Sequence, residues 1–202
     1  VNNVINNKNK SKKNEPWEDL HSKGYAARKK ENYPLAIEYY TKAIDLNNNY
    51  FKALFNRGFA YDKIGKYDLA IKDYTDAISI EPDNAYAYYN RAISNDKKGD
   101  INSTIEDFSK AISILPGKSD FYLNRAYTYR KNKEYNNAIL DYSEVIKLDS
   151  KSFKAYYNRG LCYEKIMNFD LSYIDFKQSL NLELENLKIS NNEPIELIVT
   201  NV

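Results

Sequence analysis

The stretches ALFNRGFAYDKIGKYD (residues 53–68) and AYYNRGLCYEKIMNFD (residues 155–170) decide how this chain folds. Eight of their sixteen positions are identical, and the two stretches begin 102 residues apart. Sliding the whole sequence against itself gives a shift of 34 residues, of which 102 is three. A fixed period of this size is typical of proteins built from stacked structural repeats.

The period divides residues 17–186 into five units of 34 places each. The units are residues 17–50, 51–84, 85–118, 119–152 and 153–186. A small residue recurs at the eighth place: Gly24, Gly58, Ala92, Ala126 and Gly160. A large aromatic recurs at the twenty-fourth place: Tyr40, Tyr74, Phe108, Tyr142 and Phe176. Because two antiparallel helices about 8 to 10 Å apart cannot both present bulky side chains where they cross, the small residue admits the aromatic opposite.

Each unit contains two helical patterns separated by turn residues. In the second unit, Leu54, Gly58 and Tyr61 stand at i, i+4 and i+7, which is one face of a helix. A second helical pattern follows from Tyr67 to Ile78. Asn, Asp, Ser, Gly and Pro gather between units, as they do where one helix ends and the next is capped. The sequence therefore predicts five helix-turn-helix pairs.

These units resemble tetratricopeptide repeats. The second unit supplies the family's pattern with Leu54, Gly58, Tyr61, Ala70, Tyr74, Ala77 and Pro82. The resemblance covers residues 17 to about 186 and implies an all-α, right-handed superhelical solenoid of five TPR helix-turn-helix pairs. We expect residues 1–16, rich in Asn and Lys, to be a flexible lead-in, and residues 187–202, which include the apolar Ile195 to Val199, to be a C-terminal extension or partial cap.

The seventh place departs from the family pattern, which usually has Leu there. This chain has Lys23, Arg57, Arg91, Arg125 and Arg159. The twenty-third place carries a matching acid in the last four units: Asp73, Asp107, Asp141 and Asp175. We predict that each Arg lays its aliphatic stem along the helix pair and places its guanidinium against an Asp of a neighbouring second helix, in a structural role.

Composition and charge exclude several classes of function. The 202-residue chain has a net charge of +2, and Lys8, Lys10, Lys12 and Lys13 against Glu15 supply more than that. The repeats are therefore near neutral and lack the basic field that nucleic-acid binding needs, so no nucleic acid is expected as partner. No run of about 18 apolar residues could span a membrane. The chain opens with Val rather than Met, which suggests a piece of a longer protein.

No arrangement of residues predicts catalysis. The chain has one His, His21, and one Cys, Cys162, which lie four units apart and cannot meet. Metal-ligand spacing and phosphate-binding glycine loops are missing from the sequence, so we expect no enzyme activity, no metal and no cofactor. A lone Cys also fits a reducing compartment, and we expect a cytoplasmic protein.

The resemblance implies that the first helix of each pair lines a concave groove. The candidate groove residues are Phe55, Asn56, Phe59, Lys63, Tyr89, Asn90, Lys97, Asn124, Tyr127, Lys131, Tyr157, Asn158 and Lys165. They form an aromatic floor, a row of Asn amides at the sixth place able to bond a peptide backbone bidentately, and a row of Lys at the thirteenth place that favours an acidic ligand. The alternative is that Lys and Asn are simply common at those places and that Tyr fills space.

The leading hypothesis is a non-catalytic adaptor that binds a protein or peptide segment in this groove. A subset of the family holds the C-terminal tail of chaperones with a two-carboxylate clamp, but only the central Asn of that clamp is matched here, so a chaperone tail is disfavoured. The alternative is a structural scaffold, self-associating through an open end or the convex face. RNA binding is a distant third.

Overall fold

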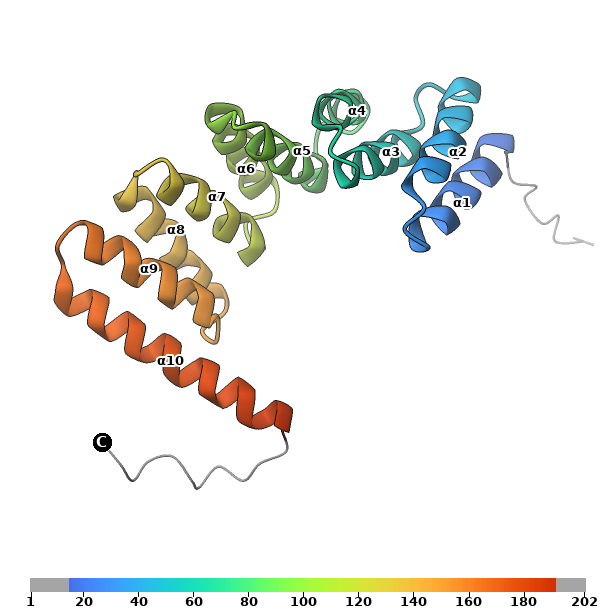
Figure 1. The fold of residues 1–202 in the computed structure, drawn as a ribbon. Helices are drawn as coiled ribbons and strands as arrows, with labels where there is room; N and C mark the ends of the chain where they lie inside the picture. The colour runs from blue at the N-terminus through green and yellow to red at the C-terminus, as the bar shows by residue number, and fades with distance from the viewer. Residues whose placement is uncertain (1–14, 192–202) are drawn as a thin grey trace, which may run out of the picture. The chain divides into compact units, whose positions relative to one another are not determined.

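The computed structural model describes residues 15–191, and the side chains of residues 15–187; this part of the chain consists of α-helices and turns, with no strand. The helices are α1 (Pro16–Lys29), α2 (Tyr33–Leu46), α3 (Phe51–Lys63), α4 (Tyr67–Ile80), α5 (Ala85–Lys98), α6 (Ile101–Ile114), α7 (Ser119–Lys131), α8 (Tyr135–Leu148), α9 (Phe153–Lys165) and α10 (Phe169–Asn191) (Figure 1). Each 34-residue interval thus holds two helices, as the sequence predicts.

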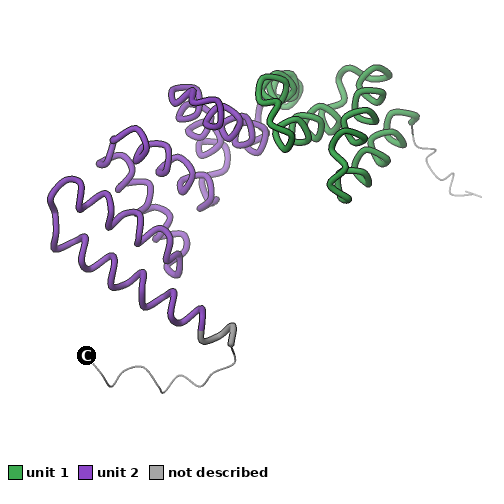
Figure 2. Tube along the Cα trace, in the orientation of Figure 1, with its two compact units in different colours: residues 1–81 green, residues 82–202 purple. Residues whose placement is uncertain are grey.

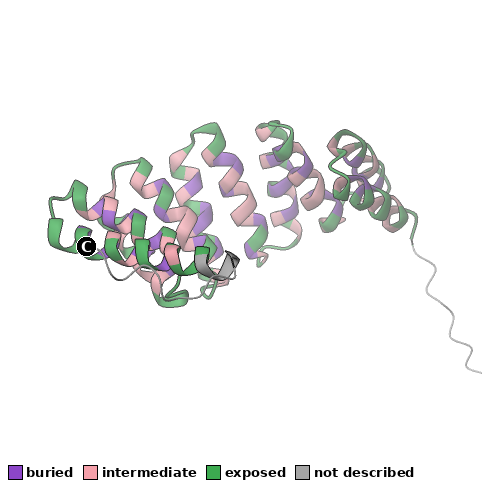
Figure 3. Ribbon diagram, turned by 60° about the horizontal axis from the view of Figure 1, so that its bottom comes forward, coloured by how far each residue is buried: buried purple, intermediate pink, exposed green. Residues whose placement is uncertain are grey.

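Every odd-numbered helix packs against the helix that follows it. The chain forms two compact units, Val1–Glu81 and Pro82–Val202, coloured separately in Figure 2. In the first unit α2 also packs on α3, and in the second α6 packs on α7 and α8 on α9. Each unit is therefore a short stack of helix pairs, and its buried residues lie along the helices while the turns between them are exposed (Figure 3).

The crossing of each helix pair is set by the small residue at the eighth place. A Cβ added to Gly24 would lie 2.7 Å from the ring of Tyr40, and one added to Gly160 would lie 2.9 Å from the ring of Phe176. Carbon atoms in contact normally stand about 3.5 to 4.0 Å apart, so only glycine permits these approaches. The predicted pairing of small and aromatic residues is confirmed.

The turn inside each pair repeats one backbone conformation at the fifteenth place. All five residues there have a left-handed φ: Glu31 at 57°, Gly65 at 75°, Gly99 at 84°, Lys133 at 64° and Met167 at 60°. A left-handed residue other than glycine costs roughly 1 to 2 kcal/mol. Three of the five turns carry this cost, so the packing of the helices, rather than the turn residue, imposes the turn.

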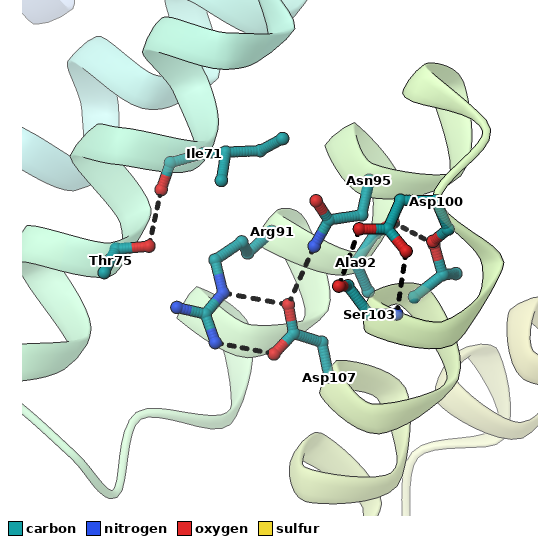
Figure 4. A network of polar contacts seen from close by, with 9 residues as sticks. Ile71, Thr75, Arg91, Ala92, Asn95, Asp100, Ser103 and Asp107 are labelled. Atoms are coloured by element: carbon teal, nitrogen blue, oxygen red, sulfur yellow. Dashed lines mark hydrogen bonds and ion pairs between the residues drawn. The ribbon is translucent and has the colours of Figure 1, made fainter.

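The predicted Arg–Asp pairs form in all four repeats that carry them. In the third repeat, Nε and Nη2 of Arg91 donate to the two carboxylate oxygens of Asp107 at 2.8 and 2.7 Å, and Asn95 donates to the same carboxylate (Figure 4). This hydrogen bond with Asp107 raises the pKa of Arg91. The equivalent bonds in the other repeats are 2.7 to 2.8 Å long. Each pair ties the first helix of a repeat to its own second helix.

The third guanidinium nitrogen links successive repeats. Nη1 of Arg125 donates to the hydroxyl of Ser109 at 2.8 Å, and Nη1 of Arg159 donates to Ser143 at 2.9 Å. Both acceptors occupy the twenty-fifth place of the preceding repeat. One Arg therefore holds the two helices of its own repeat together and also fixes that repeat against the preceding one.

The last helix is longer than the repeat requires. α10 continues from Phe169 to Asn191 without a break, so residues 187–191, the first part of the expected C-terminal extension, continue the helix of the last repeat. Leu184 occupies the thirty-second place of its unit, where the other units have Asn, Pro or Ser. Because Leu is a good helix former, the helix continues through this place. The predicted lead-in falls mostly outside the described residues, as does the apolar segment 195–199.

Candidate functional site

Two adjoining cavities in the second unit are the main candidate site. The α5–α7 cavity, of about 420 Å³, is lined by Ile93, Asp96, Lys97, Phe108, Asn124, Tyr127, Thr128, Arg130 and Lys131. The α7–α9 cavity, of about 440 Å³, is lined by Tyr127, Arg130, Phe153, Lys154, Tyr157, Asn158, Leu161, Ser179 and Glu183. Both cavities share Tyr127 and Arg130 on α7, so they adjoin along this helix, between α5 on one side and α9 on the other. Hereafter "the groove" means these two cavities together.

Six of the candidate residues from the sequence line this groove. They are Lys97, Asn124, Tyr127, Lys131, Tyr157 and Asn158. Tyr127 and Tyr157 are well exposed, at 36% and 50% of their surface. Tyr89 does not line either cavity; its ring packs 4.8 Å from Phe121, and burial raises the pKa of its hydroxyl. Asn90 and Lys165 also lie outside both cavities.

The remaining candidates belong to α3 in the first unit. Phe55 packs 5.6 Å from Phe51 and 5.7 Å from Tyr74, so it is a core residue as much as a surface residue. Lys63 lies 5.1 Å from the centre of the Phe59 ring. Asn56 approaches Nε2 of His21 at 3.1 Å. Burial lowers the pKa of His21, as do the nearby charges of Lys52 and Arg28, which keeps this imidazole neutral at physiological pH.

The row of Asn amides forms hydrogen bonds inside the protein. In each of the four residues, Nδ2 donates to the backbone carbonyl four residues earlier at 2.7 to 2.8 Å. Nδ2 of Asn124 also donates to the hydroxyl of Tyr89, and that of Asn158 to the hydroxyl of Tyr127, both at 3.1 Å. One of the two Nδ2 protons is therefore used inside the protein in each residue, and in Asn124 and Asn158 the second one as well; the bidentate bond to a ligand stays a prediction.

Two of these amides, those of Asn124 and Asn158, orient tyrosine hydroxyls. A hydroxyl that accepts a hydrogen bond still has its own proton to donate. Because Asn158 donates to the oxygen of Tyr127, the Tyr127 proton is available to an acceptor in the groove. Asn124 and Asn158, which line the groove, thus fix the positions of two tyrosine hydroxyls.

The row of Lys lies in the last turn or at the last residue of each first helix. Lys29, Lys63, Lys131 and Lys165 are the final residues of their helices, and Lys97 is the penultimate residue of α5. Cations there interact favourably with the helix dipole, which gives the row a structural role. Lys131 also pairs with Asp96 across α5 and α7, with Nζ 3.2 Å from the carboxylate.

Arg130 lies where the two cavities meet, and sequence reasoning did not select it. Its guanidinium stands 5.6 Å from the centre of the Tyr127 ring, and its Nε is buried without a hydrogen-bond partner. No carboxylate within ion-pair distance of Arg130 is present among residues 15–187. The twelfth place could have drawn attention to it, because its charge changes sign from repeat to repeat: Arg28, Asp62, Asp96, Arg130 and Glu164.

The groove carries a net positive charge. Lys97, Arg130, Lys131 and Lys154 line it against Asp96 and Glu183, an excess of two cations. Its apolar surface comes from Ile93, Phe108, Phe153 and Leu161 together with the tyrosine rings. Such a surface can hold apolar side chains and an anionic group at the same time.

The described residues contain no cluster of His, Cys, Asp or Glu able to hold a metal ion. Cys162 is fully buried, and burial raises the pKa of its thiol to about 11, which makes it unreactive at neutral pH. No helix in the described part of the chain has the length and apolar character to cross a membrane.

Comparison of the sequence with known families gives matches along most of the repeats. A tetratricopeptide repeat model matches residues 51–84, a TPR repeat model matches 24–65 and 126–166, and another tetratricopeptide repeat model matches 153–186. Together these matches cover more than half of the chain. Comparison with curated proteins finds no match.

Many solved structures share the fold. A crystal structure of MamA has 26% sequence identity and a TM-score of 0.79, covering 82% of this chain and 96% of that one. Another crystal structure of MamA protein has 24% identity and a TM-score of 0.81, with 92% and 98% covered. YrrB, described as a TPR protein with an unusual peptide-binding site, has 14% identity and a TM-score of 0.73, with 86% and 89% covered. At these identities the last two show likeness of fold alone.

Proposed function

This chain belongs to the tetratricopeptide repeat family of protein-interaction and scaffold modules, and we propose that its second unit binds an extended segment of a partner protein in the groove across α5, α7 and α9. The single observation that carries the proposal is that two cavities adjoin along α7, where Tyr127 and Arg130 line both of them. Adjoining cavities can each receive a side chain of the same extended segment. YrrB, a structural neighbour, is described as having a peptide-binding site, which supports the same use of the fold.

The chemistry of the groove favours a peptide over a small cofactor. The groove has exposed aromatic rings, a few charged groups and no cluster of ligating residues, and binding hot spots in protein interfaces are rich in Tyr and Arg. The rings of Tyr127 and Tyr157 are already held from behind, by Tyr142 at 6.0 Å and Phe176 at 5.6 Å. Rings fixed in this way lose little freedom when a partner binds.

A random peptide display library, selected against the purified chain, tests this proposal. Wild type is expected to enrich peptides, and the double variant Tyr127→Ser/Tyr157→Ser is expected to lose them. Tyr25→Ser on α1 is the matched control, because Tyr25 occupies the same ninth place as Tyr127, is 40% exposed and lies outside both cavities. Peptides that bind the double variant as well as wild type would place the interface elsewhere.

The outer face of α10 supports a second candidate, a scaffold that assembles through its last repeat. In α8, Tyr135, Ile139 and Ile146 pack against the core that α8 shares with α9. The residues 34 positions later, Phe169, Tyr173 and Leu180, are 59%, 67% and 56% exposed. An exposed apolar row at places that elsewhere meet the next repeat is a surface suited to another helix.

The twenty-fifth place limits which helix could bind there. Lys177 replaces the Ser or Thr that accepts a hydrogen bond from the Arg of a following repeat. A further repeat with Arg at its seventh place would bring two cations together, so the partner helix must be neutral or acidic at that point. Light scattering of wild type against Tyr173→Glu tests this candidate: a wild-type dimer that the variant converts to monomer supports it, and a monomeric wild type contradicts self-association.

A further inference from the structure

We propose that Arg130 receives a carboxylate of the bound segment, so that the groove selects segments in which an acidic group lies beside an apolar side chain. This inference rests on the proposed binding of a peptide in the groove, and names the chemistry that the groove recognises.

Arg130 differs from the arginines at the seventh place of the repeats. Arg57, Arg91, Arg125 and Arg159 each hold a buried Asp through two short hydrogen bonds. Arg130 has no carboxylate partner in the described part of the chain; its side chain lies beside the buried hydroxyl of Tyr142, and its Nε is buried without a partner. A guanidinium has five N–H donors, and a carboxylate that accepts from those facing the cavity would form charge-assisted hydrogen bonds.

Arg28 provides an internal comparison. It occupies the same twelfth place, 102 residues earlier, and its Nε is also buried and unpaired. Its guanidinium lies between two rings, 4.8 Å from the centre of Tyr25 and 4.9 Å from that of Phe59. Phe59 occupies the ninth place of the repeat that follows Arg28. The ninth place of the repeat that follows Arg130 holds Leu161, which lines the α7–α9 cavity. Arg130 is therefore stacked on one ring, that of Tyr127, and borders a cavity where a ligand can reach it.

Two further donors lie in the same cavity. The Tyr127 hydroxyl accepts a hydrogen bond from Asn158 and so has its proton to donate. Lys154 lines the same cavity and has no ion-pair partner among residues 15–187. A guanidinium, a hydroxyl proton and an ammonium around one space match the acceptor sites of a carboxylate, which has two oxygens and about four lone-pair sites.

The walls of the α7–α9 cavity define the neighbour of that carboxylate. Phe153, Tyr157 and Leu161 supply an apolar surface, which suits a large apolar side chain next to the acidic group. Glu183 also lines this cavity and disfavours a second carboxylate beside it. The expected ligand therefore carries one acidic group followed or preceded by an apolar residue, rather than an acidic run.

This arrangement differs from the two-carboxylate clamp that the sequence fails to match. Arg130 occupies the twelfth place of its repeat, whereas that clamp uses the second, fifth, sixth and ninth places. The sixth place, which holds Asn, contacts the tyrosine hydroxyls and the helix backbone here. The recognition proposed for Arg130 thus follows from the geometry of this groove.

The test uses peptides enriched from the random library and measures their affinity for the full chain by fluorescence anisotropy. Each peptide is made in three forms: unchanged, with its acidic side chain converted to the amide, and with its C-terminal carboxylate amidated. If the side-chain amide loses affinity, the carboxylate comes from the acidic residue. If the C-terminal amide loses affinity, it comes from the end of the peptide. Arg130→Gln is expected to lower the affinity for the unchanged peptide by about tenfold to a hundredfold, or roughly 1.4 to 2.8 kcal/mol. For the amide form that wild type binds more weakly, the variant and wild type are expected to have the same affinity.

Two more variants complete the design. Arg28→Gln removes an arginine of the same place and burial pattern, and it is expected to leave affinity unchanged. Leu161→Phe puts a ring where Phe59 covers Arg28, and it is expected to lower affinity with the helical content retained. The circular dichroism of each variant is measured alongside, so that loss of binding is separated from loss of fold.

The outcomes separate the two proposals. If wild type enriches no peptides, or only peptides that ignore Tyr127→Ser/Tyr157→Ser, the proposed function fails. The carboxylate inference is overturned if Arg130→Gln weakens the amide forms of groove-binding peptides as much as it weakens the acidic form. It is also overturned if those peptides contain no acidic residue and bind independently of their C-terminal carboxylate. Peptide binding in the groove would stand in both cases.

Discussion

Removing one partner of a buried Arg–Asp pair should destabilise the second unit far more than removing both. Arg125 and Asp141 are joined by bonds of 2.7 and 2.8 Å, and their side chains are only 18% and 7% exposed. Arg125→Met leaves the Asp141 carboxylate buried without its partner and also removes the bond to Ser109. Breaking a buried pair in this way costs about 3 to 5 kcal/mol.

The double variant Arg125→Met/Asp141→Leu should recover most of this loss. It leaves no buried charge, and apolar replacement of a buried ion pair is often neutral or stabilising. We expect its stability to lie within about 1.5 kcal/mol of wild type, which would give a coupling energy of several kcal/mol between the two positions. Lys147→Met is the control on the same helix, because Lys147 and Glu144 are 74% and 44% exposed and such a pair contributes about 0.5 kcal/mol or less.

Urea denaturation followed by circular dichroism measures these differences. Because stacked repeats can unfold in parts rather than all at once, hydrogen exchange of the α7 and α8 amides is measured as well, to show where stability is lost. The reasoning is refuted if Arg125→Met costs less than about 1 kcal/mol, or if the double variant is as unstable as the sum of the two single variants.

Three further predictions concern the packing and the single thiol. Gly24→Ala should lower stability by about 1 to 3 kcal/mol in thermal unfolding, because its Cβ would lie 2.7 Å from the buried ring of Tyr40. Gly99→Ala should cost about 1 kcal/mol, since its surroundings are open and only its φ of +84° is unfavourable for alanine. Cys162 should not react with Ellman's reagent at pH 7 until urea unfolds the chain, because its thiol is fully buried with a pKa of about 11; rapid reaction of the native protein would contradict this.

The helix pairs and their crossings could be predicted from the sequence because a single physical constraint recurs at a fixed spacing. Gly24, Gly58 and Gly160 each face an aromatic ring sixteen residues later, and steric exclusion allows few other residues there. The Arg–Asp pairs could be predicted for the same reason, since both partners recur with the same spacing of sixteen residues. Repetition in five copies turns a weak pattern into a strong one.

The site could be predicted only in part. The sequence places Asn158 on the groove but does not show that its amide donates to Lys154 and Tyr127, because that depends on how closely α7 approaches α9. Arg130 was missed because the twelfth place holds Arg in only two of the five repeats and an acidic residue in the others, so it belongs to no constant row. The unbroken run of α10 past Leu184 is hard to predict from sequence, since a missing turn residue is a weaker signal than a turn residue that is present.

The division between repeated and unrepeated places explains why structure and recognition can be separated in this chain. The eighth, twenty-third and twenty-fourth places determine how each pair packs, and their residues hardly change from repeat to repeat. The twelfth place changes sign from Arg28 to Asp62 and from Arg130 to Glu164 while the helices around it keep the same arrangement. A charge can vary there at little cost to the packing, because the first helix is already held by Arg–Asp pairs in four of the five repeats. Variation at such a place alters the surface of the groove without altering the scaffold, which is the condition for one repeat architecture to bind different partners.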